Sequence, residues 1–352
     1  MYLFFYEIRT IDLLRGSVIT PEFLQRGSHW SKLYSDRYLY SVMKEESPMY
    51  YFILNPSSQS FGSRSVWSRL SEKLKAQGIE YKVYATRYPG HGKEIARTIT
   101  TMDPRAVVIA IGGDGTIHDI LCGLTNLSTI TFGVIPSGSG NDFARGMRIS
   151  SDPDRAIRAV LEPTRYTKMD LGVLKDRQGE RFGVSSGIGF DAAICHEALN
   201  SPIKDFLNSI NLGNLTYAAI CLKQIVLFEP CSMTIEADGN RHFEVPRAYF
   251  AAVMNQKYEG GGVKMIPDAK PNDGLLDLIV VGDVTKSKIC CFLPMAFFGK
   301  HTRLKGLHFI KCTDVKITAD RTCAVHLDGE SGGMHKTLHI GLEKEKLRVI
   351  TG

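Results

Sequence analysis

Residues 106–116 read Ala-Val-Val-Ile-Ala-Ile-Gly-Gly-Asp-Gly-Thr, an apolar strand that runs directly into a glycine loop. Glycine lets the backbone approach a ligand closely, because it has no Cβ and tolerates positive φ. The exposed amides of such a loop attract an anion, and a helix predicted to start near Thr116 adds the positive end of its dipole. Asp114 lies within the loop, which is reasonable if a cation bridges its carboxylate to the ligand. The stretch therefore predicts a site for phosphate and a divalent metal.

Working outward, predicted strands and helices alternate. Strands are expected at 51–54, 81–86, 106–111 and 131–135, and helices at 63–77, 93–100 and 117–124. This alternation predicts an α/β domain with an open, mostly parallel sheet, whose ligands lie at the carboxyl ends of the strands. Those ends carry Asn55, Thr86, Asp114 and a second loop, Ser137-Gly-Ser-Gly-Asn-Asp142. Two neighbouring loops of small residues favour a phosphate-binding cleft over an isolated tight turn.

The pattern changes after a helix expected at 153–161. Most later segments read as strands, with a helix at 215–227; the strands are expected at 169–174, 182–188, 232–237, 248–254, 275–281, 315–318, 324–327 and 338–340. This pattern predicts a mostly-β, sandwich-like second domain. We expect an N-terminal extension of unknown role at 1–48, the α/β domain at 49–166 and the β-rich domain at 167–352.

Composition limits the class of protein. A chain of 352 residues with 43% hydrophobic and 23% charged residues fits two folded domains and excludes a disordered chain. The longest apolar run, 289–298, is broken by Pro294 and is about half of the ~20 residues that span a bilayer. Eight cysteines without a C-x-x-C motif, and no secretory signal, predict reduced thiols and a cytoplasmic protein. The net charge of +6 has little weight, and no nucleic-acid partner is expected.

The glycine loop lacks the Gly-Lys-Ser/Thr of a P-loop and is not a dinucleotide fingerprint. An ordered set of motifs instead resembles the soluble diacylglycerol kinase and lipid kinase family, which includes relatives of sphingosine and ceramide kinases. The resemblance extends from about Tyr50 to the C-terminus. The motifs are Gly112–Thr116, Ile135–Arg145, Gly189–Ala192, Gly260–Gly262, Pro267–Ala269, Asp273–Asp277 and Leu327–Glu330.

The resemblance implies an ATP site in the cleft between the two domains. The residues that it assigns to ATP are Asn55, Pro56, Ser57, Ser58, Gln59, Thr86, Gly113, Asp114, Gly115, Thr116, Ile117, His118, Asp119, Ser139, Asn141 and Asp142. The family usually has Asn-Glu where this chain has His118-Asp119. His118 could contact the ligand, but a helix residue near the mouth of the cleft is the favoured interpretation.

The resemblance also implies the catalytic carboxylates. Glu330 would accept the proton of the lipid hydroxyl, although the sequence alone leaves Asp328 open as the base, and Asp-Gly could be only a hairpin turn. Asp114, Asp142, Asp170 and Asp328 would surround a catalytic Mg²⁺, which suits phosphoryl transfer. A structural Mg²⁺ would be held by Asp273 and by the carbonyls of Lys270 and Leu275.

These expectations describe an ATP- and Mg²⁺-dependent lipid kinase, which most simply converts diacylglycerol to phosphatidic acid. It would act as a peripheral protein at the inner membrane face, and a homodimer is left open. The basic and aromatic segment 286–311 could rest on an anionic bilayer, although packing into the second domain is favoured. The alternatives are a kinase of a sphingoid base or another glycerolipid, an NAD kinase, and a non-catalytic sensor of nucleotide or lipid.

Overall fold

Two β-sheets organise the part of the chain that the computed structural model describes, namely residues 49–56, 62–200 and 216–352. Residues Met49–Gly352 form one compact unit. The expected extension at 1–48 and the predicted ATP-site residues Ser57, Ser58 and Gln59 lie outside the described residues. Within the described residues, no helix has both the length and the apolar character needed to cross a bilayer.

The first sheet has six strands in the order β2-β1-β3-β4-β17-β5. Four of them are parallel neighbours: β1 (Tyr50–Leu54), β2 (Tyr81–Ala85), β3 (Val107–Gly112) and β4 (Thr131–Pro136). The other two come from later in the chain. They are β17 (Leu347–Ile350), parallel to β4, and β5 (Tyr166–Met169), antiparallel to β17.

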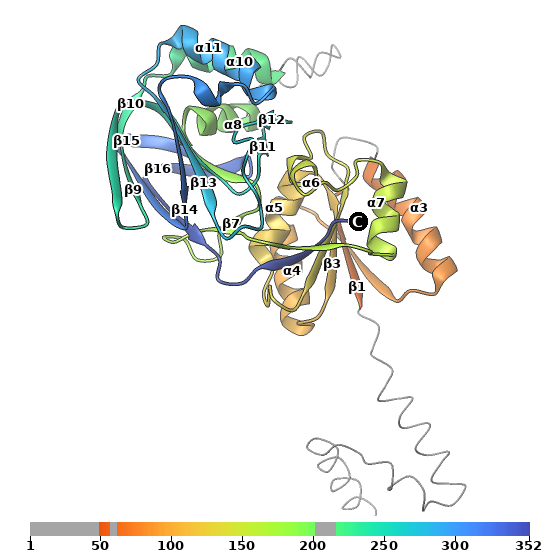
Figure 1. Cartoon of the computed structure of the whole chain (residues 1–352). Helices are drawn as coiled ribbons and strands as arrows, with labels where there is room; N and C mark the ends of the chain where they lie inside the picture. The colour runs from red at the N-terminus through yellow and green to blue at the C-terminus, as the bar shows by residue number, and fades with distance from the viewer. Residues whose placement is uncertain (1–48, 57–61, 201–215) are drawn as a thin grey trace, which may run out of the picture. The chain divides into compact units, whose positions relative to one another are not determined.

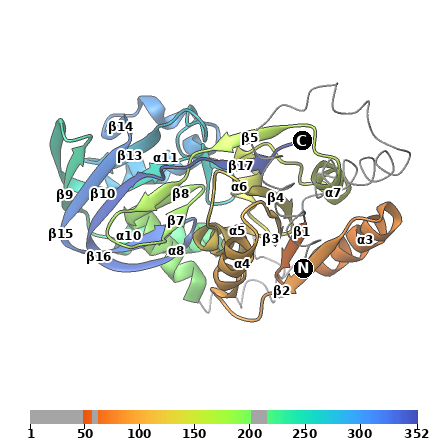
Figure 2. The ribbon, with the colours of Figure 1, turned by 90° about the horizontal axis from the view of Figure 1, so that it is seen from below.

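Helices cover both faces of this sheet (Figures 1 and 2). One face packs against α3 (Gly62–Gln77) and α7 (Pro153–Leu161), and the other against α4 (His91–Met102) and α5 (Asp114–Gly123). Strand β3 is buried along its whole length, as its apolar sequence requires when helices cover both sides. A short helix, α6 (Asp142–Gly146), follows the second glycine loop.

The second sheet has nine strands and is mostly antiparallel. Its order is β14-β13-β10-β8-β15-β16-β6-β7, with β9 paired to both β10 and β15. The bounds are β6 (Gly172–Leu174), β7 (Arg181–Phe182), β8 (Ser185–Gly189), β9 (Cys231–Ala237), β10 (Arg241–Met254), β13 (Leu276–Gly282), β14 (Leu307–Cys312), β15 (Asp314–Leu327) and β16 (Glu330–Leu342).

One side of this sheet encloses an apolar core that includes Met233, Val253 and Ile317. Three helices and a two-stranded ribbon cover the other side, where the core includes Phe190 and Phe292 (Figure 1). These elements are α8 (Phe190–Asn200), α10 (Thr216–Leu227), α11 (Lys286–Phe297), and the ribbon of β11 (Tyr258–Glu259) and β12 (Val263–Lys264), followed by a 3-10 turn at His301–Arg303.

The predicted fold class, an α/β domain followed by a β-rich sandwich-like domain, is confirmed. The interruption expected at Pro294 is wrong, because α11 continues to Phe297. Proline removes the hydrogen bond to the carbonyl four residues earlier. That carbonyl belongs to Cys290, which is exposed, so water can take the place of the missing donor.

Candidate active site

The predicted loops meet at one edge of the six-stranded sheet. The Thr86 amide donates to the Leu54 carbonyl at 2.9 Å, and the Asn55 amide donates to Ile111 at 3.2 Å. The Ser137 amide continues the series by donating to Gly112 at 2.9 Å. The carboxyl ends of β2, β1, β3 and β4 therefore lie in register, and the residues after them share one edge.

The two glycine loops touch through their backbones. A Cβ on Gly138 would lie 2.5 Å from the Cα of Gly113, and a Cβ on Gly113 would lie 3.1 Å from the Cα of Gly138. Asn141 stabilises the second loop, because its side chain accepts from the Gly138 amide at 3.1 Å and donates to the Gly138 carbonyl at 2.7 Å. Asn141 has φ 53°, a left-handed conformation that asparagine tolerates. Ser139, at the tip of the loop, is exposed.

Asp114 joins the first loop to the second. Its carboxylate accepts from the amides of Asp142 at 3.2 Å and Phe143 at 3.1 Å, and so caps the start of α6. Burial and the nearby carboxylate of Asp142 raise the pKa of Asp114 to about 6, although the two amides oppose the shift. Each carboxylate oxygen retains a lone pair for a cation or water. Asn55 reaches the same region, since its amide group donates to Oγ1 of Thr116 at 3.2 Å.

Asp142 links this edge to the β-rich domain. Its Oδ2 accepts from the Gly261 amide at 2.7 Å, and its Oδ1 pairs with Arg145. The Arg145 guanidinium also lies 5.8 Å from the ring centroid of Tyr258. Burial raises the pKa of Asp142, against the bonds from Gly261 and Arg145. The Tyr258–Gly262 segment therefore contacts the helix that follows the second glycine loop.

Asp328 and Gly329 form the two-residue turn between β15 and β16, where Leu327 pairs with Glu330. Both turn residues have positive φ, 50° and 86°, as a primed hairpin turn requires. The Asp328 carboxylate accepts three main-chain amides, from Gly183, Val184 and Ser185, at 2.7–3.1 Å. It also lies 3.1 Å from Nδ1 of His118. Asp328 thus holds the turn against β8 and α5.

Glu330 follows this turn and is partly exposed. Its carboxylate lies against the first glycine loop, because a Cβ on Gly115 would collide with Oε1 of Glu330. Gly115 is the second residue of α5. The structure therefore brings together Glu330 and the glycine loop, which are far apart in sequence.

His118 and Asp119 make contacts within the protein. His118 is buried, and its ring contacts Asp328 and Cys122. Burial alone would lower the pKa of His118, but the hydrogen bonds and charges of Asp328 and Cys122 together outweigh burial, so the pKa is well above its usual value. Asp119 accepts from the Gly90 amide at 2.9 Å, at the start of α4. Ile117 points into the apolar core.

Asp170 and Asp273 make their contacts around the loop that precedes β13. Asp170 is buried, pairs with Lys346 at 2.9 Å and accepts from the Gly274 amide at 2.8 Å. Asp273 accepts from the Leu275 amide at 3.2 Å and lies 3.4 Å from Nζ of Lys311. The carboxylate of Asp170 is therefore bonded to the loop that precedes β13.

A buried cluster of three titratable side chains in the β-rich domain was not predicted. Nε2 of His326 lies 3.2 Å from both Asp191 and Glu259, and Glu259 also accepts from the Ser185 hydroxyl at 2.8 Å. Burial raises the pKa of Glu259 to about 7; the two carboxylates raise the pKa of His326 to about 9, although burial opposes this shift. Glu259 and His326 each precede a quoted motif and Asp191 lies within one, and these positions were the available signal.

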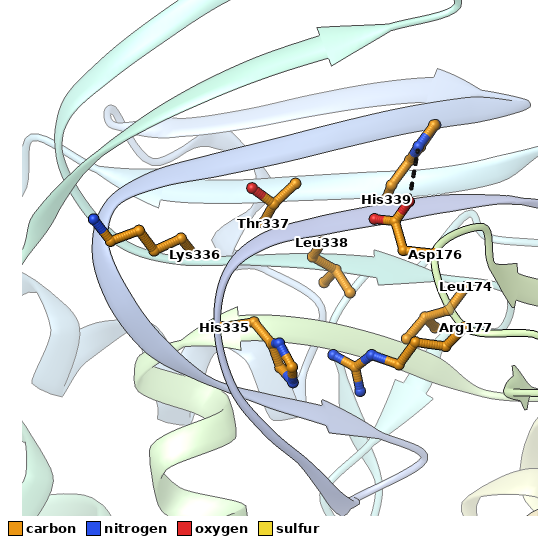
Figure 3. Close-up of a pocket in the computed structure, with 8 residues that line it drawn as sticks. All are labelled: Leu174, Asp176, Arg177, His335, Lys336, Thr337, Leu338 and His339. Carbon is orange, nitrogen blue, oxygen red and sulfur yellow. Dashed lines mark ion pairs between the residues drawn. The ribbon is translucent and has the colours of Figure 1, made fainter.

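A cavity of about 490 Å³ lies elsewhere on the β-rich domain, between β6 and β16 (Figure 3). The side chains of His339 and Asp176 face each other there at 3.9 Å, and those of His335 and Arg177 lie next to each other in another part of the cavity. None of the predicted site residues lines this cavity. The lining residues are Leu174, Asp176, Arg177, His335, Lys336, Thr337, Leu338 and His339.

Comparisons with known proteins identify the family of this chain. Residues 49–174 match the family described as the diacylglycerol kinase catalytic domain, and residues 185–351 match the YegS C-terminal NAD kinase beta sandwich-like domain. YtlR of Bacillus subtilis (strain 168), named as a candidate lipid kinase, is 30% identical over 292 residues, 81% of this chain and 94% of that protein. A diacylglycerol kinase of the same strain is 28% identical over 308 residues, 84% of this chain and 96% of that protein.

The fold also matches that of a solved structure. A crystal structure of a candidate diacylglycerol kinase from Bacillus anthracis str. Sterne aligns with a TM-score of 0.69 at 22% identity, covering 86% of this chain and 97% of the other. Fold and sequence together define a lipid kinase, an enzyme that transfers a phosphoryl group. The chain belongs to the bacterial diacylglycerol kinase family.

Proposed function

We propose that this kinase transfers the γ-phosphoryl group of ATP to the hydroxyl of diacylglycerol and so makes phosphatidic acid. The observation that carries the proposal is the position of the Glu330 carboxylate against Gly115, at the start of α5. A proton acceptor for the lipid hydroxyl and a loop suited to phosphate then lie side by side. Phosphoryl transfer needs these two elements together, with a metal to neutralise charge.

The residues at the sheet edge fit a phosphate group. Helix α5 begins directly after β3, so its first amides have no acceptor within the helix and face the loop region. A carboxylate, that of Glu330, already lies at this helix end, which indicates that the place favours an anion. The backbone contact of Gly113 with Gly138 keeps side chains out of the loops. ATP, when bound, supplies the phosphoryl group, and Mg²⁺ reduces its charge.

Glu330 is better suited than Asp328 to accept the proton. The oxygens of Asp328 accept three amides and contact His118, so its carboxylate anchors the turn. Glu330 is the next carboxylate along the chain and is partly exposed, so a substrate can reach it. In this proposal Asp328 positions the turn, Glu330 accepts the proton, and the carboxylates of Asp114 and Asp142 would hold the metal.

The loop around Asp273 fits a structural Mg²⁺. One carboxylate and the carbonyls of Lys270 and Leu275 are the hard oxygen ligands that Mg²⁺ prefers. The ammonium of Lys311 lies 3.4 Å from Asp273 and 2.9 Å from Asp277, and it would compete with the ion. A magnesium titration followed by thermal unfolding tests this role. The melting temperature should rise with Mg²⁺, and Asp273→Ala should reduce that rise.

Two neighbouring helices, α10 and α11, supply a surface suited to an anionic membrane. They lie side by side on the β-rich domain (Figure 1), and Lys286 on α11 donates to the Val226 carbonyl on α10 at 2.7 Å. Large apolar side chains are exposed on or next to both helices; we call this set the α10–α11 surface, and it comprises Leu222, Val226, Leu227, Phe297 and Phe298. Exposed basic residues accompany it: Lys223, Lys288, Lys300, Arg303 and Lys305. Apolar side chains with basic neighbours match the chemistry of an anionic lipid surface.

Radiolabelled ATP and a panel of lipids in mixed micelles test the proposed reaction. Label in phosphatidic acid is the expected result with diacylglycerol. Label in a phosphorylated sphingoid base or in another glycerolipid would keep the kinase and replace the acceptor. NAD is included in the panel, and label in NADP with none in lipid would refute the proposal. ATP binding without transfer to any acceptor would point to a sensor.

A further inference from the structure

A mixed set of metal-ligand side chains lies along α5, among residues that the proposed reaction does not use. His118 and Cys122 are four residues apart on the helix and so share a face. Sγ of Cys122 lies 3.8 Å from Nε2 of His118. Glu180, just before β7, completes the group, because the three ligand atoms all lie within 4.8 Å of one another. Imidazole, thiolate and carboxylate are the protein ligands of zinc.

The orientation of the His118 ring is suited to metal binding. Nδ1 lies 3.1 Å from Oδ2 of Asp328 and can donate to it, so Nε2 is the ring nitrogen that faces Cys122, and a metal would take the place of the proton on Nε2. A carboxylate that holds the outer nitrogen of a histidine is the usual support of a zinc ligand. Three main-chain amides fix this carboxylate in turn. The ring therefore has a defined direction without the metal.

The Cys122 sulfur also has a supporting contact. The Arg181 amide lies 3.4 Å from Sγ and can donate to it. In the thiol form the S–H can donate to the Arg181 carbonyl, 3.3 Å away. A metal would replace the thiol proton, which is released on binding, and the Arg181 amide would remain as a donor to the thiolate.

Glu180 gives the group an open side. His118 and Cys122 are buried, whereas the Glu180 side chain is 31% exposed, so water and ions can approach from there. Nζ of Lys93 lies 2.7 Å from Oε1 of Glu180. The ammonium group of Lys93 therefore already neutralises the carboxylate of Glu180, and a metal ion would compete with it.

We propose that Nε2 of His118, Sγ of Cys122 and the Glu180 carboxylate bind one zinc ion, with water as the fourth ligand. The site is separate from the Mg²⁺ sites of the proposed reaction and does not depend on the acceptor lipid. Asp328, which contacts the ring of His118, also lies in the turn that precedes Glu330. Zinc binding is therefore coupled to the position of that turn.

Cobalt substitution tests the ligand set directly, because a thiolate bound to Co²⁺ gives a charge-transfer band in the near ultraviolet. The full-length protein should bind one equivalent of Co²⁺ with this band, and Zn²⁺ should displace it. Cys122→Ser should lose the band, and His118→Gln should weaken binding by at least about tenfold. Cys291→Ser, at an exposed cysteine, is the matched control and should keep the band.

Lys93→Ala should raise zinc affinity, whereas the ligand substitutions should lower it. Removing the ammonium from Glu180 should strengthen zinc binding by about two- to fivefold, measured by competition with a chromophoric chelator. A band that persists in Cys122→Ser, or a wild-type protein with no thiolate band, would overturn the proposal. If Cys122→Ser does not fold, Glu180→Gln tests the ligand set through affinity: zinc binding should weaken, and an unchanged zinc affinity in that variant would overturn the proposal as well.

Discussion

At the scale of single residues, the carboxyl of Asp114 has a pKa of about 6, raised by burial and by Asp142. The folded protein thus binds a proton at Asp114 more tightly than the unfolded chain does. Its contribution to stability is present below pH 4 and is lost as the pH rises through about 6. Relative to Asp114→Asn, the wild-type free energy of unfolding should fall by on the order of 2 kcal/mol between pH 4 and pH 7.

Urea unfolding of both proteins at several pH values measures this difference. A difference between the two proteins that stays constant across this range would contradict the raised pKa. The variant should also lose kinase activity, because its amide cannot supply the charge that we assign to a metal ligand.

Glu330 is the residue on which the proposed chemistry depends most. Glu330→Gln should lower kcat by about 10²- to 10⁴-fold, because an amide cannot accept the proton of the lipid hydroxyl. ATP affinity, measured by calorimetry, should change little. Glu236→Gln alters an exposed carboxylate on β9 and should keep full activity. An undiminished kcat in Glu330→Gln would exclude the assigned role.

At the scale of elements, a substitution at the start of α5 should lower activity without lowering stability. Alanine favours a helix more than glycine does, so Gly115→Ala should not lower the free energy of unfolding. The new Cβ would displace the carboxylate of Glu330, which is the end of a flexible side chain. We expect kcat to fall at least about tenfold with the melting temperature unchanged or higher.

Gly138→Ala is the matched comparison. There the new Cβ meets main-chain atoms of Gly113 at 2.5 Å, and neither loop can move aside as easily as a side chain. This variant should lose both activity and stability, by about 1–3 kcal/mol. If thermal unfolding shows the same stability loss for both variants, the contact assigned to Glu330 is wrong.

The sequence predicted the elements whose pattern is local. The alternation from Tyr50 onward gave the parallel strands and their helices, because a covered strand such as β3 needs a continuous apolar run. Helix α8 was not predicted: it follows β8 directly, and its hydrophobic pattern is weakly amphipathic. The break expected at Pro294 was wrong, because α11 continues through it. The low helix propensity of proline takes no account of water, which can bond to the Cys290 carbonyl in place of the missing amide.

At the scale of the whole molecule, the α10–α11 surface makes a prediction about binding to lipid. Replacing Phe297 and Phe298 by serine removes two exposed aromatic side chains, each worth about 1.5–3 kcal/mol when buried. Binding to vesicles that contain phosphatidylglycerol should weaken by at least about tenfold in a sedimentation assay. Activity on a short-chain diacylglycerol in detergent should remain.

Met334 provides a control for the α10–α11 surface. Met334 is also an exposed apolar residue of the β-rich domain but lies on β16, so Met334→Ser should bind vesicles as the wild type does. Equal vesicle binding by the double variant and the wild type would show that another surface meets the membrane.

The parts of the site that the sequence did not predict are contacts between distant segments. His118 and Asp328 are 210 residues apart, and Ser185 is 74 residues from Glu259. No spacing rule relates such pairs, because only the folded chain brings the turn after β15 to α5, and β11 to β8. Motif positions indicated where the chemistry lies, whereas the partners of His118 required the folded chain.

The position of β17 has a consequence for how this protein is synthesised. Residues 347–350 form an inner strand between β4 and β5, and the Gly352 carbonyl accepts the amides of Thr164 and Arg165 at 2.7 Å. Until the ribosome has translated these residues, β4 has no neighbouring strand on the side where β17 pairs with it, and its backbone groups there are unpaired. Unpaired edges invite aggregation, so the nascent chain needs protection late in translation. The domain that is made first is therefore completed only by residues that are made after the second.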